Sequence, residues 1–365
     1  MTIDASNDRS PDKFLNGDKI TIREVAKHAG VSISSVSRAL SDHPHVSDEL
    51  RARVQASALA LGYQPDFLAH SLRSGRTQSV GFIVGTISNP IMADISASLG
   101  NVLAEHGYAL MLLSSQNRPE MDVSYLQFLA RRQASGLIIS TATSGTGHID
   151  DLLAQLEIPT VMLDRERLPG NHISSVQSDH RSAMQAAVLH LVSQGHRRIA
   201  LIGGKDIFPA RARLAGFYDG FQQAGIEAEP SLVRSSGMSK AVGYNETLSL
   251  MAAANRPTAL IAGGNLILAG VLQALQELKI AVGRDLALIG CDDTELTRLY
   301  SPAITVIARD LALIGETAAR LLLETIQNED EKQDGSGSSG TAGKTVILPT
   351  QLVIRESSLR SPIPV

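Results

Sequence analysis

A short segment near the N-terminus carries side chains suited to contacts with a DNA duplex. Residues 32–40 have the sequence SISSVSRAL, in which Val36, Ala39 and Leu40 recur at the spacing of one helix face. Serine hydroxyls can approach phosphates and bases closely, isoleucine can meet a thymine methyl group, and arginine can make a forked contact with guanine or phosphate. The side chains predicted to face DNA are Ser32, Ile33, Ser34, Ser35, Ser37 and Arg38.

These side chains need a helix that its neighbours hold in place. Apolar residues at i, i+3, i+4 and i+7 from Ile22 predict a first helix that Gly30 ends, and Ser32 stands at the N-cap of a second. A third helix is expected to begin at Ser47, where two acidic residues favour the helix N-terminus. The first two helices form a helix–turn–helix pattern, whose second helix enters the major groove. The pattern leaves a small helical bundle with a serine-rich surface as the alternative.

Charge and composition limit the classes of protein. The chain has 365 residues, 43% of them hydrophobic, and a net charge of −4, which excludes a wholly disordered protein and a general polyanion binder. Residues 20–76 hold seven basic residues against five acidic ones, so any nucleic-acid contact is local.

No apolar run reaches the roughly 18 residues of a membrane helix. Cys291 is the only cysteine, which excludes an intrachain disulfide and a multi-cysteine zinc site. Without a secretory signal, a cytoplasmic protein with no metal or cofactor is expected.

Beyond residue 79, buried strands alternate with helices. This alternation predicts doubly wound parallel sheets, and its length indicates two linked α/β lobes. Strands are expected at 80–84, 109–113, 136–140, 160–164, 199–204, 258–264 and 286–291, and helices at 92–106, 120–132, 180–194, 210–224, 239–253 and 266–278.

Local composition also marks the boundaries between the parts of the chain. Residues 1–19 are polar and expected to form a disordered tail, and residues 20–64 form the helix–turn–helix domain. Residues 65–78 are expected to be a hinge helix and linker, before the two-lobed domain at 79–365. Within that domain, a polar Gly/Ser-rich stretch at 328–345 is expected to be a solvated loop before a final strand.

A series of motifs runs from the helix–turn–helix to the C-terminus. TIREVAKHAGVS, VSRAL and LGYQP come first, followed by ISNP, LDR, GHRRIALIGG, RLAGF, RPTALIAGG, LIGCDDTEL and SPAITVI. Over residues 20–357 the chain closely resembles the LacI/GalR family of bacterial transcription regulators. The resemblance implies a sequence-specific DNA-binding protein, more often a repressor, in which an all-α helix–turn–helix domain precedes an α/β domain similar to the periplasmic binding proteins. Its operator affinity would be controlled by a small-molecule effector.

The resemblance also implies roles for residues at the DNA. A homodimer would bind a pseudo-palindromic operator, and His45 matches a family position that can reach the DNA. The hinge helix 66–73 would fold only on DNA beside its dimer mate, with Leu72 wedged into the minor groove and Arg73 lying along it. The residues expected at phosphates are Thr21, Ser32 and Ser47, and those expected at bases are Ile33, Ser34 and Arg38.

The larger domain resembles the periplasmic sugar-binding fold, which holds its ligand between two lobes at the carboxyl ends of strands. Ile91 and Met92 stand where many sugar-binding relatives have aromatic residues, Met238 stands where some have tryptophan, and Asn265 replaces the usual aspartate. These departures favour a smaller or acidic effector, such as a sugar acid, held by Arg213. The expected effector-binding residues are Asn89, Asp164, Phe208, Arg213, Asn265 and Asp292.

Two other classes of protein are compatible with parts of the pattern. A solute receptor would share the two lobes but would need export. An α/β enzyme would need a nucleophile–base pair or a phosphate loop. The segment SSGTAGKT at 338–345 nearly forms a P-loop, but Ser338 stands at the first glycine and a strand-like segment follows. We therefore expect no enzyme activity. No heptads follow Arg355, so a dimer is expected and not a tetramer.

Overall fold

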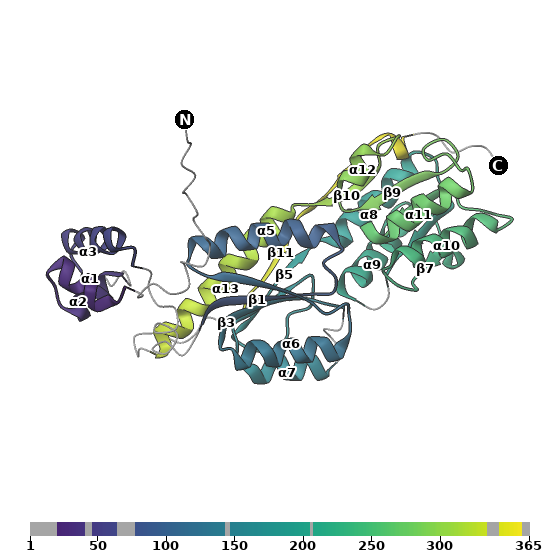
Figure 1. Cartoon of the computed structure of the whole chain (residues 1–365). Coiled ribbons are helices and arrows are strands. Elements are labelled where there is room, and N and C mark those ends of the chain that lie inside the picture. The colour runs from purple at the N-terminus through teal and green to yellow at the C-terminus, as the bar shows by residue number, and fades with distance from the viewer. Residues whose placement is uncertain are drawn as a thin grey trace, which may run out of the picture. The chain divides into compact units, whose positions relative to one another are not determined.

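The computed structural model divides the chain into two units, Met1–Gly75 and Arg76–Val365 (Figure 1). The predicted tail, His45 and the hinge residues Leu72 and Arg73 lie outside the described residues. The structure describes residues 20–40, 46–63, 77–142, 147–204, 207–333 and 343–359.

In the described part of the N-terminal unit, three short helices pack together as the sequence predicts. They are α1 (Ile22–Ala29), α2 (Ile33–Leu40) and α3 (Asp48–Leu61). Gly30 follows α1 in the left-handed conformation, at φ 67°, where glycine has no Cβ to clash. The hydroxyl oxygen of Ser47 accepts a hydrogen bond from the Leu50 amide at 3.3 Å and caps α3. The buried core residues are Val25, Ala26, Ala29, Val36, Ala39, Val54 and Ala58.

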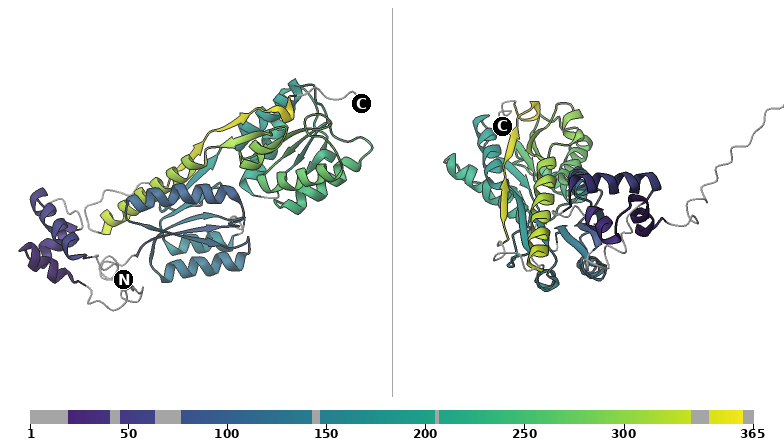
Figure 2. Two further views of the ribbon diagram at one scale, coloured as in Figure 1. Left: turned by 45° about the horizontal axis from the view of Figure 1, so that its top comes forward. Right: turned by 90° about the vertical axis from the view of Figure 1, so that its left-hand side faces the viewer.

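The second unit contains two six-stranded sheets, one in each lobe (Figures 1 and 2). The first-lobe sheet has the order β11-β5-β4-β3-β1-β2, and all its pairings are parallel. The second-lobe sheet has the order β12-β10-β9-β8-β6-β7, where only β12 is antiparallel to its neighbour. The strands are β1 (Thr77–Val84), β2 (Ala109–Ser114), β3 (Ala134–Ser140), β4 (Thr160–Leu163), β5 (Ile173–Ser178), β6 (Ile199–Ile202), β7 (Val233–Arg234), β8 (Ala259–Ala262), β9 (Ala287–Cys291), β10 (Thr305–Arg309), β11 (Thr345–Leu348) and β12 (Thr350–Val353).

Helices cover both faces of each sheet. In the first lobe, α5 and α13 lie on one face of the sheet, while α6 and α7 lie on the other (Figure 1). The first-lobe helices are α5 (Pro90–Glu105), α6 (Pro119–Arg131), α7 (His148–Leu156) and α13 (Leu311–Gln333). The second-lobe helices are α8 (His180–Ser193), α9 (Phe208–Gln223), α10 (Lys240–Ala252), α11 (Asn265–Glu277) and α12 (Glu295–Leu299).

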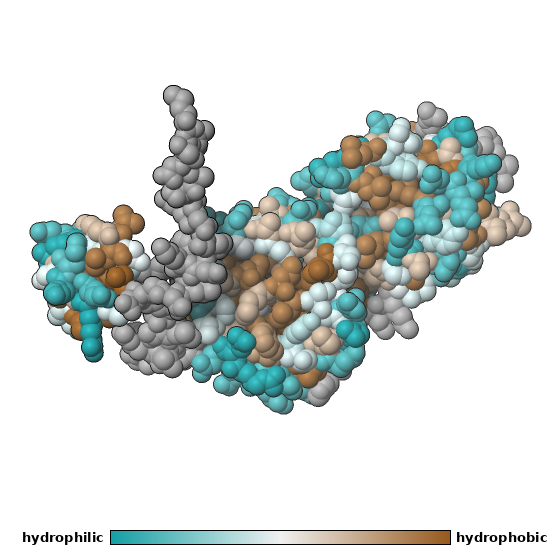
Figure 3. Space-filling model, in the orientation of Figure 1, coloured by the Kyte–Doolittle hydropathy of each residue, from teal (hydrophilic) through white to brown (hydrophobic). Residues whose placement is uncertain are grey.

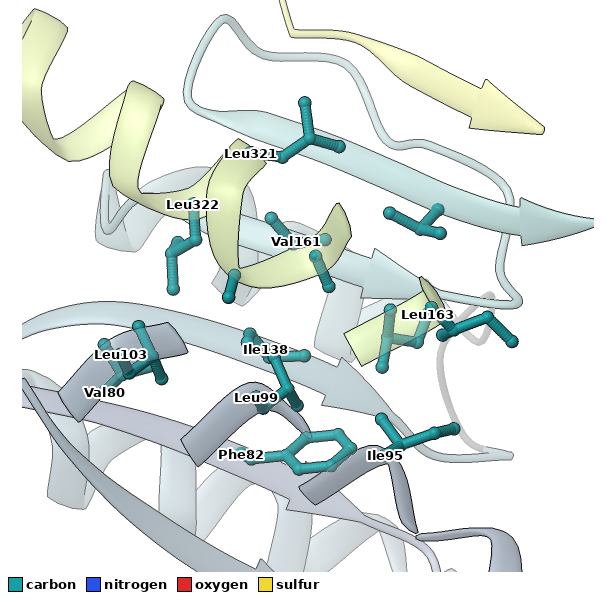
Figure 4. Close-up of a cluster of buried hydrophobic side chains, with 14 of the residues drawn as sticks. Val80, Phe82, Ile95, Leu99, Leu103, Ile138, Val161, Leu163, Leu321 and Leu322 are labelled. Carbon is teal, nitrogen blue, oxygen red and sulfur yellow. The ribbon is translucent and has the colours of Figure 1, made fainter. Parts of the chain in front are cut away.

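Alternate strand residues build the core of the first lobe. Val80 and Phe82 of β1 point to the same face of the sheet, beside Ile138 of β3 (Figure 4). Leu99 of α5 and Leu322 of α13 pack onto them and are fully buried (Figure 4). This apolar layer fixes the position of each strand along its own axis, and therefore the place where each strand ends.

Among the described residues, the chain crosses between the lobes three times. The crossings run from β5 to α8, from β10 to α13 and from β11 to β12. The Asp179 amide donates to Leu348 O at 2.9 Å, and the Thr350 hydroxyl donates to Asp179 O at 2.6 Å, which ties the first and third crossings together. In Figure 2, the C-terminal strands, drawn in yellow, run along both lobes.

The structure corrects several sequence expectations. The final strand-like segment is two strands in different sheets, because Pro349 breaks it and proline cannot donate to a ladder. Part of the predicted loop, Asn328–Gln333, continues α13 as its last turns. Strand β5 was not predicted because its sequence, ISSVQS, is polar, although the hydroxyls of Ser174 and Ser175 are buried and hydrogen-bonded. The other elements not predicted are α7, α12, α13, β7 and β10.

Gly270 marks a close approach of α11 to α10, and it provides a test of the packing. A Cβ there would lie 2.0 Å from the Lys240 carbonyl oxygen, so Gly270→Ala must push the two helices apart. We expect a loss of about 1–3 kcal/mol, seen as a lower thermal unfolding midpoint of the full chain. Gly100→Ala in α5 is the control, because the nearest side-chain atom there is 3.8 Å away. An equal fall in both variants would contradict the packing argument.

Candidate DNA interface and effector site

One face of α2 holds the helix to its domain, and the other is open. Val36 and Ala39 are fully buried, whereas Ile33 is 46% exposed in the first turn. An exposed isoleucine beside hydroxyl and guanidinium groups is suited to an apolar contact with a partner and contributes little to the domain's own core. Of the predicted set, the exposed residues are Ser32, Ile33, Ser34 and Arg38, and the half-buried ones are Ser35 and Ser37.

Hydroxyl groups cluster at the start of α2. Ser32 Oγ accepts a hydrogen bond from the Ser35 amide at 3.1 Å, which confirms the predicted N-cap. It also lies 2.8 Å from both Ser34 Oγ and Ser35 Oγ. Three hydroxyl hydrogens serve these two contacts, so at least one hydrogen can donate outward to a phosphate or base.

Thr21 and Ser47, the other predicted phosphate contacts, both take part in helix caps. The Thr21 amide and hydroxyl both donate to Glu24 Oε2, at 2.6 and 3.0 Å, and these bonds lower the pKa of the Glu24 carboxyl. The Thr21 hydroxyl must therefore turn away from Glu24 to donate to a phosphate. Ser47 uses its oxygen to cap α3 and keeps its hydroxyl hydrogen for another acceptor.

In the larger unit, two of the predicted effector residues follow strands in the same unusual conformation. Asp164 comes directly after β4 and Asp292 directly after β9, with φ values of 49° and 71°. Residues other than glycine rarely adopt positive φ, and such strain is concentrated at functional sites. The Asp164 amide donates to Val176 O at 2.8 Å, and the Asp292 amide donates to Ile307 O at 2.9 Å, so the neighbouring strands hold both turns in place.

Arg309, which the sequence reasoning missed, joins these two carboxylates. Its Nη1 lies 2.5 Å from Asp164 Oδ2, while its Nε and Nη2 lie 2.7 and 2.6 Å from Asp292 Oδ1. Only 5% of the Arg309 side chain is exposed. Burial opposes the charge, but the carboxylates of Asp292 and Asp164 raise the pKa of Arg309 above its ordinary value.

His180, at the start of α8, links the same cluster to Arg213. Arg213 lies within α9, where it donates from Nη1 to Gly263 O at 2.6 Å and from Nη2 to His180 Nδ1 at 3.3 Å. His180 Nε2 lies 3.2 Å from Asp164 Oδ1. The ring of Phe208, the predicted aromatic residue, meets the His180 ring edge-on at a centroid distance of 6.4 Å.

These contacts fix the protonation states in the cluster. Burial lowers the pKa of His180 to about 4, so the imidazole is neutral near pH 7. Because a guanidinium can only donate, Nδ1 of His180 must accept from Arg213, which leaves the hydrogen on Nε2 to face Asp164. Burial opposes ionisation of Asp164, but His180 and Arg309 outweigh it and hold the pKa of this carboxyl well below its ordinary range.

A third buried arginine, Arg165, lies beside the cluster. Arg165 donates from Nε to Thr141 O and from Nη1 to Asp164 O, both at 2.6 Å. Burial lowers the pKa of Arg165 to about 10, which still leaves it charged near pH 7. Two carboxylates, those of Asp164 and of the buried Asp122, act against the effect of burial and raise the pKa of Arg165. Arg213 Nε is also buried without a hydrogen-bond partner among the described residues.

The two predicted asparagines form a separate contact between the lobes. Asn265 Nδ2, at the start of α11, donates to Asn89 Oδ1, which precedes α5, at 2.7 Å. Met238 packs against Gly264, the residue before Asn265, since a Cβ on Gly264 would lie 2.9 Å from Met238 Cε. In the described part of the chain, no direct hydrogen bond or ion pair joins this asparagine pair to the charged cluster.

The structure thus brings most of the predicted effector residues together, and it does so through two residues that were missed. Asp164, Asp292 and Arg213 are connected by Arg309 and His180. Both linking residues stand at crossings between the lobes, one ending β10 and the other beginning α8. Polar residues at the carboxyl ends of strands were the candidates for ligand contacts, and Arg309 would have been among them if residues 305–309 had been recognised as a strand.

The described ranges lack two further features. No helix there combines the length and apolar character needed to cross a bilayer. No group of three or more histidine, cysteine or acidic residues gathers there as ligands for a metal ion.

Comparison with known proteins identifies the family of this chain. Residues 21–66 match the model for bacterial regulatory proteins of the lacI family, and residues 188–358 match a periplasmic binding protein-like domain. The HTH-type transcriptional repressor PurR of Haemophilus influenzae strain PittEE is 32% identical over 313 residues, which cover 85% of this chain and 92% of that protein. The chain belongs to the LacI family. It is a DNA-binding transcriptional repressor that responds to a small-molecule effector, and it is not an enzyme.

Solved structures of LacI-family proteins agree with this assignment. The lac repressor dimer bound to operator and the anti-inducer ONPF has a TM-score of 0.72 and 26% identity, covering 94% of this chain and all of that chain. The complex of the transcriptional regulator CelR with cellobiose has a TM-score of 0.68 and 27% identity, covering 93% and 99%. The predicted family and fold class are therefore confirmed, and the solute-receptor and enzyme alternatives fall away.

The buried neutral imidazole of His180 predicts a loss of stability in mild acid. An unfolded chain takes up this proton near pH 6.5, whereas the folded protein resists until about pH 4, so the unfolded state binds more protons between these values. Stability is full above pH 6.5 and falls as the pH drops towards 4, by up to about 3 kcal/mol from this group.

The measurement is the unfolding midpoint of the wild type and of His180→Gln across this pH range. Glutamine keeps a donor and an acceptor but takes up no proton, so the midpoint of the variant should fall less steeply. Equal slopes in the two proteins would show that His180 is not buried in its neutral form.

Proposed function

We propose that the protein binds a pseudo-palindromic operator as a homodimer, with one α2 helix in the major groove of each half-site. The observation that carries this proposal is the open side of α2, where Ile33, Ser34 and Arg38 are all exposed while Val36 and Ala39 face the core. In this proposal the first three read bases. Ser35 and Ser37 support them, and the phosphate contacts come from Thr21, Ser32 and Ser47.

His45 and the hinge belong to the same proposal on the strength of the family resemblance. His45 would reach the DNA from beyond α2. Leu72 would enter the minor groove at the operator centre and kink it, with Arg73 along the groove, because a wedge gains contacts from bent DNA. A repressor that works on the chromosome acts in the cytoplasm, where we place this protein.

The edge of the first-lobe sheet supports the dimer. Strand β2 lies at the end of that sheet, carries the sequence ALMLLS, and none of its six residues is buried. Figure 3 shows hydrophobic residues gathered on the first lobe between α5 and α6. An exposed apolar edge of this kind marks a surface that a partner covers. We infer that a second copy of this chain covers it.

We infer that the effector is a sugar or, preferably, a sugar acid bound near Arg213 and Asp292. The cellobiose in the CelR complex makes a sugar framework the natural starting class. The buried, unpartnered Nε of the Arg213 guanidinium favours an added negative charge, because a buried cationic donor without an acceptor is costly. The remaining proposed contacts are Asn89, Asp164, Phe208 and Asn265.

Effector binding would act on the operator through the arrangement of the lobes. The effector can shift this arrangement only if it binds one form more tightly than the other. The lobes join the N-terminal unit through residues 65–78, so a change between the lobes would alter how the two hinge segments of a dimer meet. Whether the effector strengthens or releases operator binding depends on which form it prefers.

Arg38→Ala tests the DNA part of the proposal. Loss of a forked contact to guanine should cost about 1–3 kcal/mol for the specific operator and relax the preference at one base pair. A gel-shift titration against a promoter fragment and a random competitor measures both effects. Lys27→Ala, an exposed basic residue of α1 outside the predicted set, is the control. Equal losses of operator affinity in the two variants would show that Arg38 contributes only its positive charge and does not read a base.

A thermal-shift series tests the effector class. Sugar acids should raise the unfolding midpoint and neutral hexoses of equal size should not, since saturation at about 100 times Kd adds about 2.7 kcal/mol. Arg213→Gln should lose the response. Strong stabilisation by a neutral hexose, with none by its acid, would overturn the preference for an anion.

A further inference from the structure

Arg309 makes a contact that belongs to both lobes. Asp164 follows β4 of the first-lobe sheet, Asp292 follows β9 of the second, and the Arg309 guanidinium lies between them with three nitrogen–oxygen distances of 2.5 to 2.7 Å. Arg309 itself is the last residue of β10, at the crossing into α13. The side chain therefore spans the lobes at the point where the chain passes between them.

The chemistry of the contact makes it a strong interaction between the lobes. Guanidinium is planar and presents several donors in a fixed fork, so one group can bind two carboxylates at once. The exposed fractions of the Arg309, Asp164 and Asp292 side chains are 5%, 14% and 4%. In such a buried site, separating the lobes would leave charges without partners, which is strongly unfavourable.

We propose that Arg309 is an interlobe clamp, a positioning residue that holds the two lobes in one arrangement when no effector is bound. Two other contacts also bridge the lobes. The asparagine pair Asn89–Asn265 is neutral and contributes a single hydrogen bond, and the ion pair of Arg211 with Glu166, at 3.0 Å, is exposed, so that solvent screens it. The clamp therefore supplies most of the electrostatic cost of changing the lobe arrangement.

The clamp also defines how an effector acts, a step that rests on the proposed function. Asp164 Oδ1 already receives the Ser178 amide at 2.9 Å and faces His180, while Oδ2 faces Arg309. A ligand that bonds to either carboxylate must share or displace these contacts. Effector binding and loss of the clamp are then linked, because the effector would bond to the same carboxylate oxygens that bind Arg309.

A distance measurement between the lobes tests the clamp without DNA or effector. Glu120→Cys on α6 and Lys240→Cys on α10 place spin labels at exposed sites on either lobe, while Cys291 is only 1% exposed and stays unlabelled. Mixing labelled chains with excess unlabelled chains limits each dimer to one labelled pair. We expect one narrow distance distribution in the otherwise wild-type protein, and a broader distribution or a second maximum in Arg309→Gln.

A neighbouring ion pair supplies the matched control. Arg355 Nη2 contacts Asp293 Oδ2 at 2.9 Å, next to Asp292, but both residues belong to the second lobe. Arg355→Gln should therefore keep the narrow distribution. Asp164→Asn removes the first-lobe end of the clamp and should repeat the effect of Arg309→Gln, which guards against a folding defect of one variant.

Two results would overturn the clamp. The first is a folded Arg309→Gln or Asp164→Asn protein with the wild-type distribution, and the second is equal broadening in Arg355→Gln. Operator titrations of the same variants separate the clamp from the proposed function. If the lobes loosen but operator affinity stays the same, the clamp stands, and the proposed coupling between lobe arrangement and DNA is wrong.

Discussion

The burial of charge at the meeting point of two sheets is the constraint on which the larger unit depends. Asp164 and Asp292 each adopt a left-handed backbone conformation, which costs free energy for a residue with a side chain. That cost is offset because the amides of both turns donate backbone hydrogen bonds to the adjacent strands and because Arg309 joins the two carboxylates. The apolar layers of both lobes fix where β4 and β9 end and thereby bring these groups within reach of each other.

The same residues serve as proposed ligand contacts and as links between lobes. His180 begins α8 at one crossing and Arg309 ends β10 at another, so the groups that would sense a ligand are also part of the chain connections that a lobe movement would bend. A site built this way needs no separate path to transmit a signal across the unit. Differential affinity for two lobe arrangements is sufficient for coupling.

The sequence predicted those parts of the structure that depend on local periodicity. Buried runs such as 199–204 and 286–291 located strands, and the apolar spacing after Ile22 located the first helix of the helix–turn–helix. Arg309 and His180 escaped prediction because their partners lie far along the chain, and because β5 and β10 were not recognised as strands. The break at Pro349 was also missed, since a continuous apolar alternation carries no sign that its halves join different sheets.

The composition of the helical unit explains why control from a distant site can work. Residues 20–76 hold only seven basic residues against five acidic ones, and the open face of α2 offers mainly hydroxyls and a single guanidinium. Phosphate contacts supply most non-specific affinity, so one such unit alone gains little electrostatic attraction to DNA. Strong binding then requires two units held at the spacing of the half-sites, where the second contact benefits from a high effective concentration. Because that benefit vanishes when geometry prevents simultaneous contact, a modest rearrangement of the lobes, as in the proposed mechanism, would be enough to change operator affinity substantially.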